Sequence, residues 1–111
     1  MLVNIFFKTC NGVTPLDFLP IIMFYVYILL SLKDNLWYTG YTDNLKRRFE
    51  EHNKGLNYST RKRRPFKLIY YEACLNEDDA KMREAYLKTG MGKRYLKNRL
   101  KFYLNNLNKK I

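Results

Sequence analysis

Apolar residues in this chain occur in two patterns, continuous β-prone runs and helical spacings. The first run, residues 24–30 (FYVYILL), is rich in aromatic and β-branched side chains, as in a buried strand. A polar stretch at 33–35 separates it from a second β-prone run at 36–41 (LWYTGY), and such a pair predicts a β-hairpin. A third run, residues 66–71 (FKLIYY), follows Pro65 and predicts a third strand.

Helical spacing follows the hairpin over about residues 43–54. Thr42 or Asp43 offers an N-cap, and Gly55 offers a C-terminal stop. Three apolar or aromatic positions at i, i+4 and i+7 share one face: Leu45, Phe49 and His52. The segment is therefore predicted to be a helix.

Two more helices are predicted after the third strand. Asn76 with Asp79 resembles a capping box and opens a helix that runs to about Lys88 and is ended by Gly90. The last helix spans about residues 92–106, and its apolar stripe is formed by Leu96, Leu100, Tyr103 and Leu107. The predicted order is β-β-α-β-α-α. It corresponds to a small α+β fold, with a three-stranded antiparallel sheet flanked by helices.

The length of 111 residues corresponds to one domain. We expect an N-terminal extension over residues 1–22, the domain itself over 23–104, and a basic Asn/Lys-rich tail over 105–111. An ordered N-terminal arm is the alternative for the extension, which lacks the features of a secretory signal. The apolar run at 18–30 is shorter than the roughly 20 residues that cross a membrane, so we expect no membrane span.

Charge points to a polyanionic partner. The chain has 21 Lys and Arg against 10 Asp and Glu, a formal net charge of +11, and residues 1–22 contribute nothing to that excess. Nucleic acid is the first expectation, and an anionic membrane surface is the second. Two cysteines and a single histidine are too few for a structural zinc site, and they favour a reducing, cytoplasmic setting.

Five side chains in this framework could supply the chemistry of a nuclease. They are two hairpin tyrosines, two residues of the first helix and one of the second: Tyr27, Tyr38, Arg48, His52 and Glu84. Hydrolysis of a phosphodiester needs a base, a cation for the phosphate, a metal and help for the leaving oxygen. One carboxylate, with water and phosphate, can hold a hard divalent cation.

Each of the five also has a structural explanation when it is taken alone. Strand tyrosines commonly pack, and Arg48 belongs to a run of basic residues typical of a solvated face. His52 near a helix end can compensate the helix dipole, and Glu84 can pair with Lys88 at i, i+4. Only the arrangement as a whole favours a functional interpretation.

That arrangement resembles the GIY-YIG nuclease superfamily. YVY at 25–27 and YTG at 38–40 match its two half-motifs across a ten-residue gap, and the stretch 38–52 (YTGYTDNLKRRFEEH) is the most specific part. The resemblance runs from about residue 24 to 100. It is closest to the small single-domain bacterial proteins grouped with the N-terminal nuclease domain of the excision-repair C subunit. The departures are Tyr25 and Val26 in the first half-motif and Thr39 in the second.

The resemblance implies metal-dependent hydrolysis of a phosphodiester bond. Tyr27 would act as the general base or position the water, and Tyr38 would contact the phosphate or share the proton transfer. Gly40 would let the backbone approach closely without a clashing side chain. These assignments leave open which tyrosine is the base.

The same resemblance assigns roles to the three helical residues. Arg48 would stabilise charge on the phosphate in the transition state. His52 would assist proton movement or hold a tyrosine hydroxyl. Glu84 would bind Mg²⁺ or Mn²⁺, with water completing the coordination shell.

Two basic sets would grip the phosphate backbone without choosing a sequence. They are Arg61, Lys62, Arg63 and Arg64, and Lys93, Arg94, Lys97 and Lys101. The expected function is an endonuclease that acts on nucleic acid, with DNA expected ahead of RNA, in repair or DNA processing. The alternatives are a nucleic-acid-binding module that keeps the fold without cleaving, and a subunit whose protein partner supplies target recognition.

Overall fold

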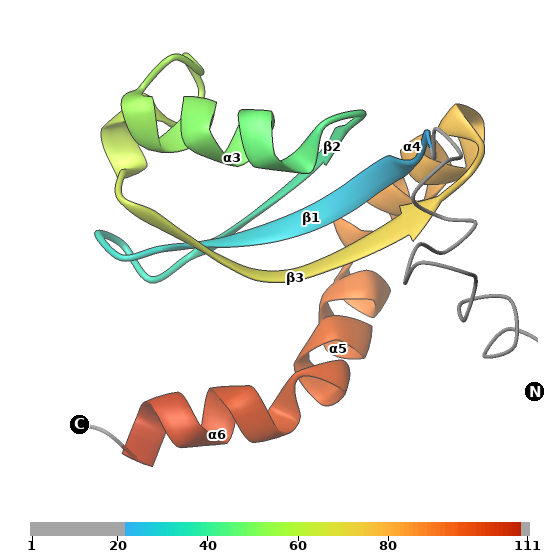
Figure 1. Ribbon diagram of the computed structural model, residues 1–111. Helices are drawn as coiled ribbons and strands as arrows, with labels where there is room; N and C mark the ends of the chain where they lie inside the picture. The colour runs from blue at the N-terminus through green and yellow to red at the C-terminus, as the bar shows by residue number, and fades with distance from the viewer. Residues whose placement is uncertain (1–21, 110–111) are drawn as a thin grey trace, which may run out of the picture.

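The computed structural model describes residues 22–109, in which three strands form one antiparallel sheet. β1 (Phe24–Ser31) is the central strand, with β2 (Trp37–Thr42) on one side and β3 (Phe66–Cys74) on the other (Figure 1). All three predicted strands are present. The predictions for residues 1–22 and for the last two residues of the tail lie almost entirely outside the described part of the chain.

Helices cover both faces of this sheet. α3 (Leu45–Lys54) lies on one side, and α5 (Gly90–Arg99) and α6 (Lys101–Lys109) lie on the other (Figure 1). α4 (Glu77–Leu87) follows β3 and packs against β1 and β2. Because both faces are covered, the central strand is buried over most of its length, and the predicted α+β fold is confirmed.

The register of the hairpin decides which side chains share a face. Tyr27 stands opposite Gly40, and Leu29 stands opposite Tyr38. Directly paired residues of antiparallel strands project to the same face, and alternate residues do so as well. Tyr27 and Tyr38 therefore lie on one face of the sheet, although they are not directly paired.

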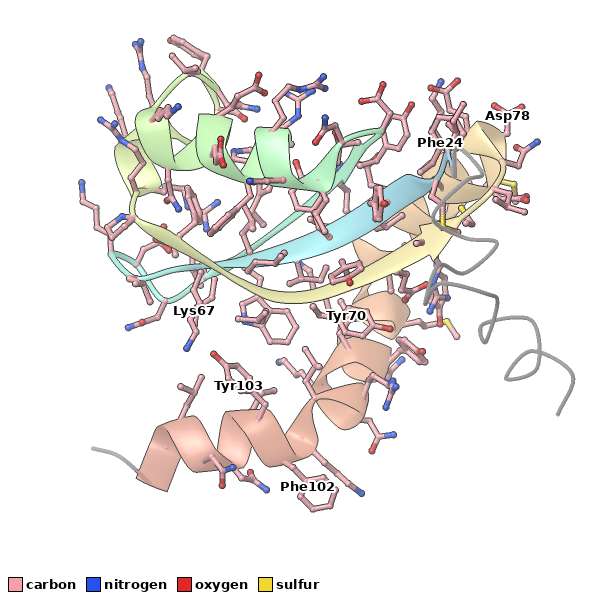
Figure 2. The ribbon with its side chains drawn as sticks, viewed as in Figure 1. Phe24, Lys67, Tyr70, Asp78, Phe102 and Tyr103 are labelled. Carbon is pink, nitrogen blue, oxygen red and sulfur yellow. The ribbon has the colours of Figure 1, made fainter. Side chains whose placement is uncertain are left out.

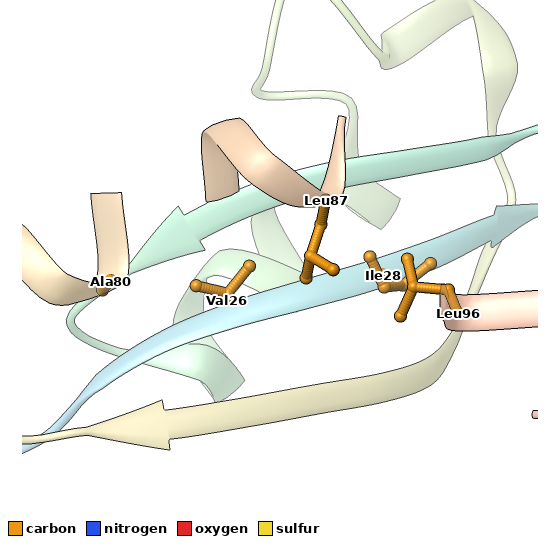
Figure 3. Close-up of a cluster of buried hydrophobic side chains, with 5 residues drawn as sticks. All are labelled: Val26, Ile28, Ala80, Leu87 and Leu96. Atoms are coloured by element: carbon orange, nitrogen blue, oxygen red, sulfur yellow. The ribbon is translucent and has the colours of Figure 1, made fainter. Parts of the chain in front are cut away.

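Two separate clusters form the core, one on each face. On the α3 face, Tyr27, Leu29 and Phe66 are buried, with Leu45 and Phe49 packed against them. On the other face the buried residues are all aliphatic: Val26, Ile28, Ala80, Leu87 and Leu96 (Figure 3). Burying one such side chain stabilises the fold by about 1.5–3 kcal/mol.

The helix ends differ in part from those predicted. α3 begins at Leu45 because Asn44, rather than Thr42 or Asp43, is the N-cap, and its side chain accepts a hydrogen bond from the Arg47 amide. Gly55 ends α3 in a left-handed conformation (φ 78°), as predicted.

Two expectations about the C-terminal half were wrong. Gly90 does not end α4, which stops at Leu87; it is the first residue of α5, behind the N-cap Thr89. The single helix predicted over 92–106 is divided at Leu100, where φ −106° and ψ 18° interrupt the helical backbone. The apolar residues keep their helical spacing across Leu100, so the hydrophobic pattern does not reveal where the helix is divided.

α6 turns back beneath the sheet after that break. Figure 2 shows Lys67 and Tyr70 projecting from β3 toward the side on which Tyr103 of α6 lies. The Lys67 ammonium is 5.5 Å from the centre of the Tyr103 ring. Within residues 22–109, no helix has the length and apolarity that crossing a membrane requires.

Candidate active site

A buried chain of three polar side chains lies at the centre of the α3 face. The Tyr27 hydroxyl is 2.9 Å from Nε2 of His52, and Nδ1 of the same ring is 2.7 Å from Oγ1 of Thr60. Tyr27 is 2% exposed, and His52 and Thr60 are fully buried. Buried polar groups of this kind must satisfy one another, so the three side chains hold each other in place.

Tyr38 completes an aromatic enclosure around the imidazole. Its ring centre lies 5.1 Å from that of His52 and 6.4 Å from that of Tyr27. Phe66 is 6.0 Å from His52 on an edge-to-face contact. Two predicted tyrosines and the predicted histidine are therefore brought together by β1, β2 and α3.

Gly40 leaves the space that the Tyr27 phenol occupies. A Cβ atom at position 40 would lie 2.4 Å from the Cζ and hydroxyl oxygen of Tyr27, far inside van der Waals contact. Because the two residues are directly paired across the hairpin, neither can move away without disturbing the register. Any side chain at position 40 would displace the hydroxyl end of Tyr27.

Burial and charge set the protonation states of this cluster. Burial is the main reason that the pKa of Tyr27 is raised above its ordinary value. Burial, followed by the nearby Arg48 cation, lowers the pKa of His52 to about 4. At neutral pH the phenol is thus protonated and the imidazole is neutral.

Arg48 and Glu84 act on Tyr27 from the edge of the cluster. The Arg48 cation lowers the pKa of Tyr27, and the Glu84 carboxylate raises it, so both charges lie within electrostatic range of the phenol. Arg48 forms an ion pair with Glu51 at 3.2 Å, and Glu84 forms one with Lys88 at 3.3 Å. The i, i+4 pairing expected of Glu84 alone is present, and the Glu84 carboxylate also raises the pKa of Tyr27.

The donor set for a metal is a single carboxylate. Within the described residues no group of three or more His, Cys, Asp or Glu side chains is placed to hold a metal ion. The Glu84 carboxylate is 23% exposed, and its paired Lys88 is a flexible, exposed side chain. This arrangement fits a hard divalent cation that takes one protein oxygen and completes its shell with water and phosphate.

A hollow at the start of α3 lies beside this cluster, not over it. Its volume is about 380 Å³, and it is bordered by aromatic residues of the sheet and by the start of α3: Tyr25, Asp43, Asn44, Leu45, Lys46 and Tyr71. Tyr71 stands directly opposite Tyr27 on β3, so its ring belongs to the same face. Tyr25 and Tyr71 meet edge to face at 6.0 Å, and Tyr71 is 52% exposed.

The two predicted basic sets lie in different places. Arg61, Lys62 and Arg63 form a short 3-10 helix, η2 (Arg61–Arg63), directly after Thr60. Within it Arg63 is already engaged, because it binds Asp34 at 2.7 Å. The second set is on α5 and the start of α6, on the side of the sheet away from α3: Lys93, Arg94, Lys97 and Lys101. Because the two basic sets lie on different elements, their positions in the sequence do not show that one short duplex contacts both of them.

Sequence reasoning missed Thr60, Tyr25 and Tyr71 as members of this site. Thr60 lies in a loop with no periodicity, and only the position of His52 gives its hydroxyl a partner. Two-residue alternation along β3 could not place Tyr71, because a β-bulge at Ile69 puts Ile69 and Tyr70 in the cluster on the opposite face and shifts the register. The tyrosines at 25 and 27 do follow the two-residue period of β1.

Comparisons with known proteins identify the family of this domain. The GIY-YIG catalytic domain matches residues 23–96. A UPF0213 protein from Pediococcus acidilactici is 44% identical over 86 residues, which cover 75% of this chain and 83% of that protein. Another UPF0213 protein, from Clostridium perfringens, is 48% identical over 67 residues, covering 60% of this chain and 71% of the relative.

One solved structure is also similar. It is the solution NMR structure of the UPF0213 protein BH0048 from Bacillus halodurans, with 37% sequence identity, a TM-score of 0.43, and coverage of 68% of this chain and 82% of that one. The domain match extends over most of the chain and includes all five residues of the tyrosine, histidine, arginine and glutamate arrangement. The chain belongs to the GIY-YIG family of nuclease domains and is related to its UPF0213 proteins.

Proposed function

We propose that this protein is a metal-dependent endonuclease that hydrolyses phosphodiester bonds in DNA in preference to RNA. The observation that carries the proposal is the buried Tyr27–His52 hydrogen bond. Gly40 leaves room for the Tyr27 phenol, and the opposite charges of Arg48 and Glu84 shift the pKa of that phenol in opposite directions. The net charge of +11 supports a polyanionic substrate.

We assign to Tyr27 the role of the general base that takes a proton from the attacking water. Its phenol is protonated in the free protein, so it must lose that proton to serve as a base. The Arg48 cation favours the loss, whereas the Glu84 carboxylate opposes it. Pairing of Glu84 with a cation would remove this opposition, which couples metal binding to the reactivity of Tyr27.

Glu84 would hold Mg²⁺ or Mn²⁺, which supplies positive charge to the scissile phosphate and acidifies bound water. Arg48 would exchange its ion pair with Glu51 for the phosphate oxygens, whose spacing suits a guanidinium. Tyr38 would contact the phosphate from the other side of His52.

The aromatic hollow extends the proposed site along the sheet. Tyr25 and Tyr71 offer rings at its wall, and Lys46 offers a cation at its rim. A base stacked on an exposed aromatic ring contributes about 1–3 kcal/mol in other nucleic-acid-binding proteins. We assign the hollow, at the start of α3, to the nucleotide on one side of the scissile phosphate. We assign Arg61, Lys62 and Arg64, which follow the C-terminal end of α3, to the backbone on the other side.

The test is cleavage of a panel of labelled DNA and RNA structures with and without Mg²⁺ or Mn²⁺. Wild type is compared with Glu84→Gln and with Glu50→Gln, which removes the same charge from an exposed position on α3. We expect metal-dependent cleavage by wild type and Glu50→Gln, and none by Glu84→Gln. Binding without cleavage by wild type on every substrate would favour the non-catalytic module instead.

A further inference from the structure

The hydroxyl of Thr60 is the least explained polar group of the buried chain. The backbone of Thr60 is already satisfied: its amide donates to the Asn57 carbonyl at 3.2 Å, and its carbonyl accepts from the Arg63 amide at 2.9 Å. Its hydroxyl lies 2.7 Å from Nδ1 of His52 in a fully buried position. The distance is that of a strong hydrogen bond whose direction depends on where the imidazole carries its proton.

The imidazole carries one proton at neutral pH, because burial and Arg48 keep the pKa of His52 low. Two arrangements are then open. In the first, Nδ1–H donates to Thr60 and the Tyr27 hydroxyl donates to Nε2. In the second, the Thr60 hydroxyl donates to Nδ1 and Nε2–H donates to the Tyr27 oxygen.

The two arrangements differ in where they leave a hydroxyl proton without an acceptor. The first leaves it on Thr60, which is fully buried and whose hydroxyl contacts His52 alone among the described residues. Such a buried, unsatisfied donor costs about 1–3 kcal/mol. The second leaves it on Tyr27, which is 2% exposed whereas Thr60 is fully buried, and whose phenol lies within electrostatic range of the Glu84 and Glu51 carboxylates. We take this hydroxyl as the one for which an outside acceptor, water or a substrate oxygen, is found at lower cost.

We infer that Thr60 is a positioning residue that fixes His52 in the Nε2–H tautomer. His52 then donates to Tyr27 rather than accepting its proton. This choice rests on the proposed function only for its catalytic consequence: a donor at 2.9 Å stabilises the phenolate form of Tyr27, the form that takes a proton from the attacking water and returns to the phenol.

The chain itself makes this inference directly measurable, because it contains a single histidine. Long-range ¹H–¹⁵N spectra of the imidazole in the ¹⁵N-labelled full chain at neutral pH therefore report on His52 alone. We expect Nδ1 to show the shift of a bare ring nitrogen and Nε2 that of a protonated one. The reverse pattern in wild type would overturn the inference.

Two variants test whether Thr60 is the cause. Thr60→Ser keeps the hydroxyl and should keep the wild-type spectrum. Thr60→Val removes it and should move the proton toward Nδ1, or mix the two tautomers. An unchanged spectrum in folded Thr60→Val would show that Thr60 does not set the tautomer. Were Thr60→Val to misfold, the wild-type and Thr60→Ser spectra would still decide the tautomer and its dependence on the hydroxyl's placement.

Kinetics then test the catalytic consequence. Loss of a residue that orients a functional histidine commonly lowers activity 10- to 100-fold. We expect kcat of Thr60→Val to fall on the order of tenfold with little change in KM, and Thr60→Ser to restore it. If wild type cleaves nothing while the spectra match, the proposed function fails but the tautomer assignment stands. If wild type cleaves and the tautomer is reversed, the inference alone fails.

Discussion

The two faces of the sheet receive alternate side chains of the same strand and make different use of them. On the face covered by α4 and α5, β1 contributes Val26 and Ile28 to an entirely aliphatic cluster. On the α3 face it contributes Tyr27, which is just as deeply buried but hydrogen-bonded to His52. The aliphatic face stabilises the sheet without constraining its chemistry. The α3 face also buries Leu29 and Phe66, but its cluster includes a hydrogen-bonded phenol and imidazole in place of aliphatic side chains.

Truncating a side chain on the aliphatic face should have the largest effect on stability and should separate stability from cleavage activity. Ile28 is fully buried between α4 and α5, so Ile28→Ala should lower the free energy of unfolding by about 2–5 kcal/mol. The folded protein should cleave at the wild-type rate. Urea unfolding and single-turnover cleavage at low temperature measure both quantities. A rate that falls with full folding retained would mean that the faces are not independent.

Removal of the Arg48 cation from the α3 face should have the opposite effect: the cleavage rate should fall while the protein stays folded. Arg48→Ala should lower the cleavage rate by about 10²-fold or more, because one transition-state donor is worth roughly 3–4 kcal/mol. Arg47→Ala is the matched control: it removes the neighbouring guanidinium, which pairs with Asp43 and Glu51. Both variants should bind nucleic acid with similar, modest losses. Equal rates in the two variants would return Arg48 to the solvated basic face.

Filling the space at Gly40 tests the geometry of the phenol. Gly40→Ala should displace the Tyr27 ring and lower the rate by about 10²-fold, since misplacement by about 1 Å has that effect. Gly90→Ala is the control, because a Cβ atom there meets nothing within 4 Å. A crystal structure of each variant alongside its cleavage rate makes the comparison. Wild-type activity in Gly40→Ala would contradict a fixed position for Tyr27.

The buried imidazole should make stability depend on pH. An unfolded histidine has a pKa near 6.5, whereas that of His52 in the folded protein is about 4. The unfolded chain therefore takes up the proton first as the pH falls, and stability present above pH 6.5 is lost progressively toward pH 4, by about 1–3 kcal/mol. Urea unfolding of wild type and His52→Gln at pH 7, 5.5 and 4 measures this. The variant should lose the part of the slope that His52 contributes, and identical slopes would refute the assignment.

Much of this molecule could be predicted from its sequence, and the exceptions have physical causes. The strands and α3 were predictable because aromatic and β-branched runs, and a Gly55 stop, are local signals. The break at Leu100 was not, because the apolar stripe continues across it. Thr60 was not, because a loop residue acquires its partner only when β1 and α3 pack together.

The candidate site divides in the same way. The tyrosines, Arg48, His52 and Glu84 could be named from their resemblance to a family pattern, although each has a structural explanation when taken alone. Their proximity could not be derived from spacing, because the register that places Tyr27 opposite Gly40 depends on the folded hairpin. The roles assigned to these residues stay predictions until rates are measured.

The most direct test compares the same chemical change on the two faces. Tyr27→Phe removes a hydroxyl from the α3 face, and Tyr70→Phe removes one from the opposite face, where it donates to Glu72 at 3.1 Å. The measurement is metal-dependent cleavage by both variants and wild type, with melting temperatures alongside. We predict that Tyr27→Phe loses about 10²- to 10⁴-fold in rate, the range for a general base, and that Tyr70→Phe cleaves like wild type. Equal rates in the two folded variants would contradict the claim that chemistry resides on the α3 face.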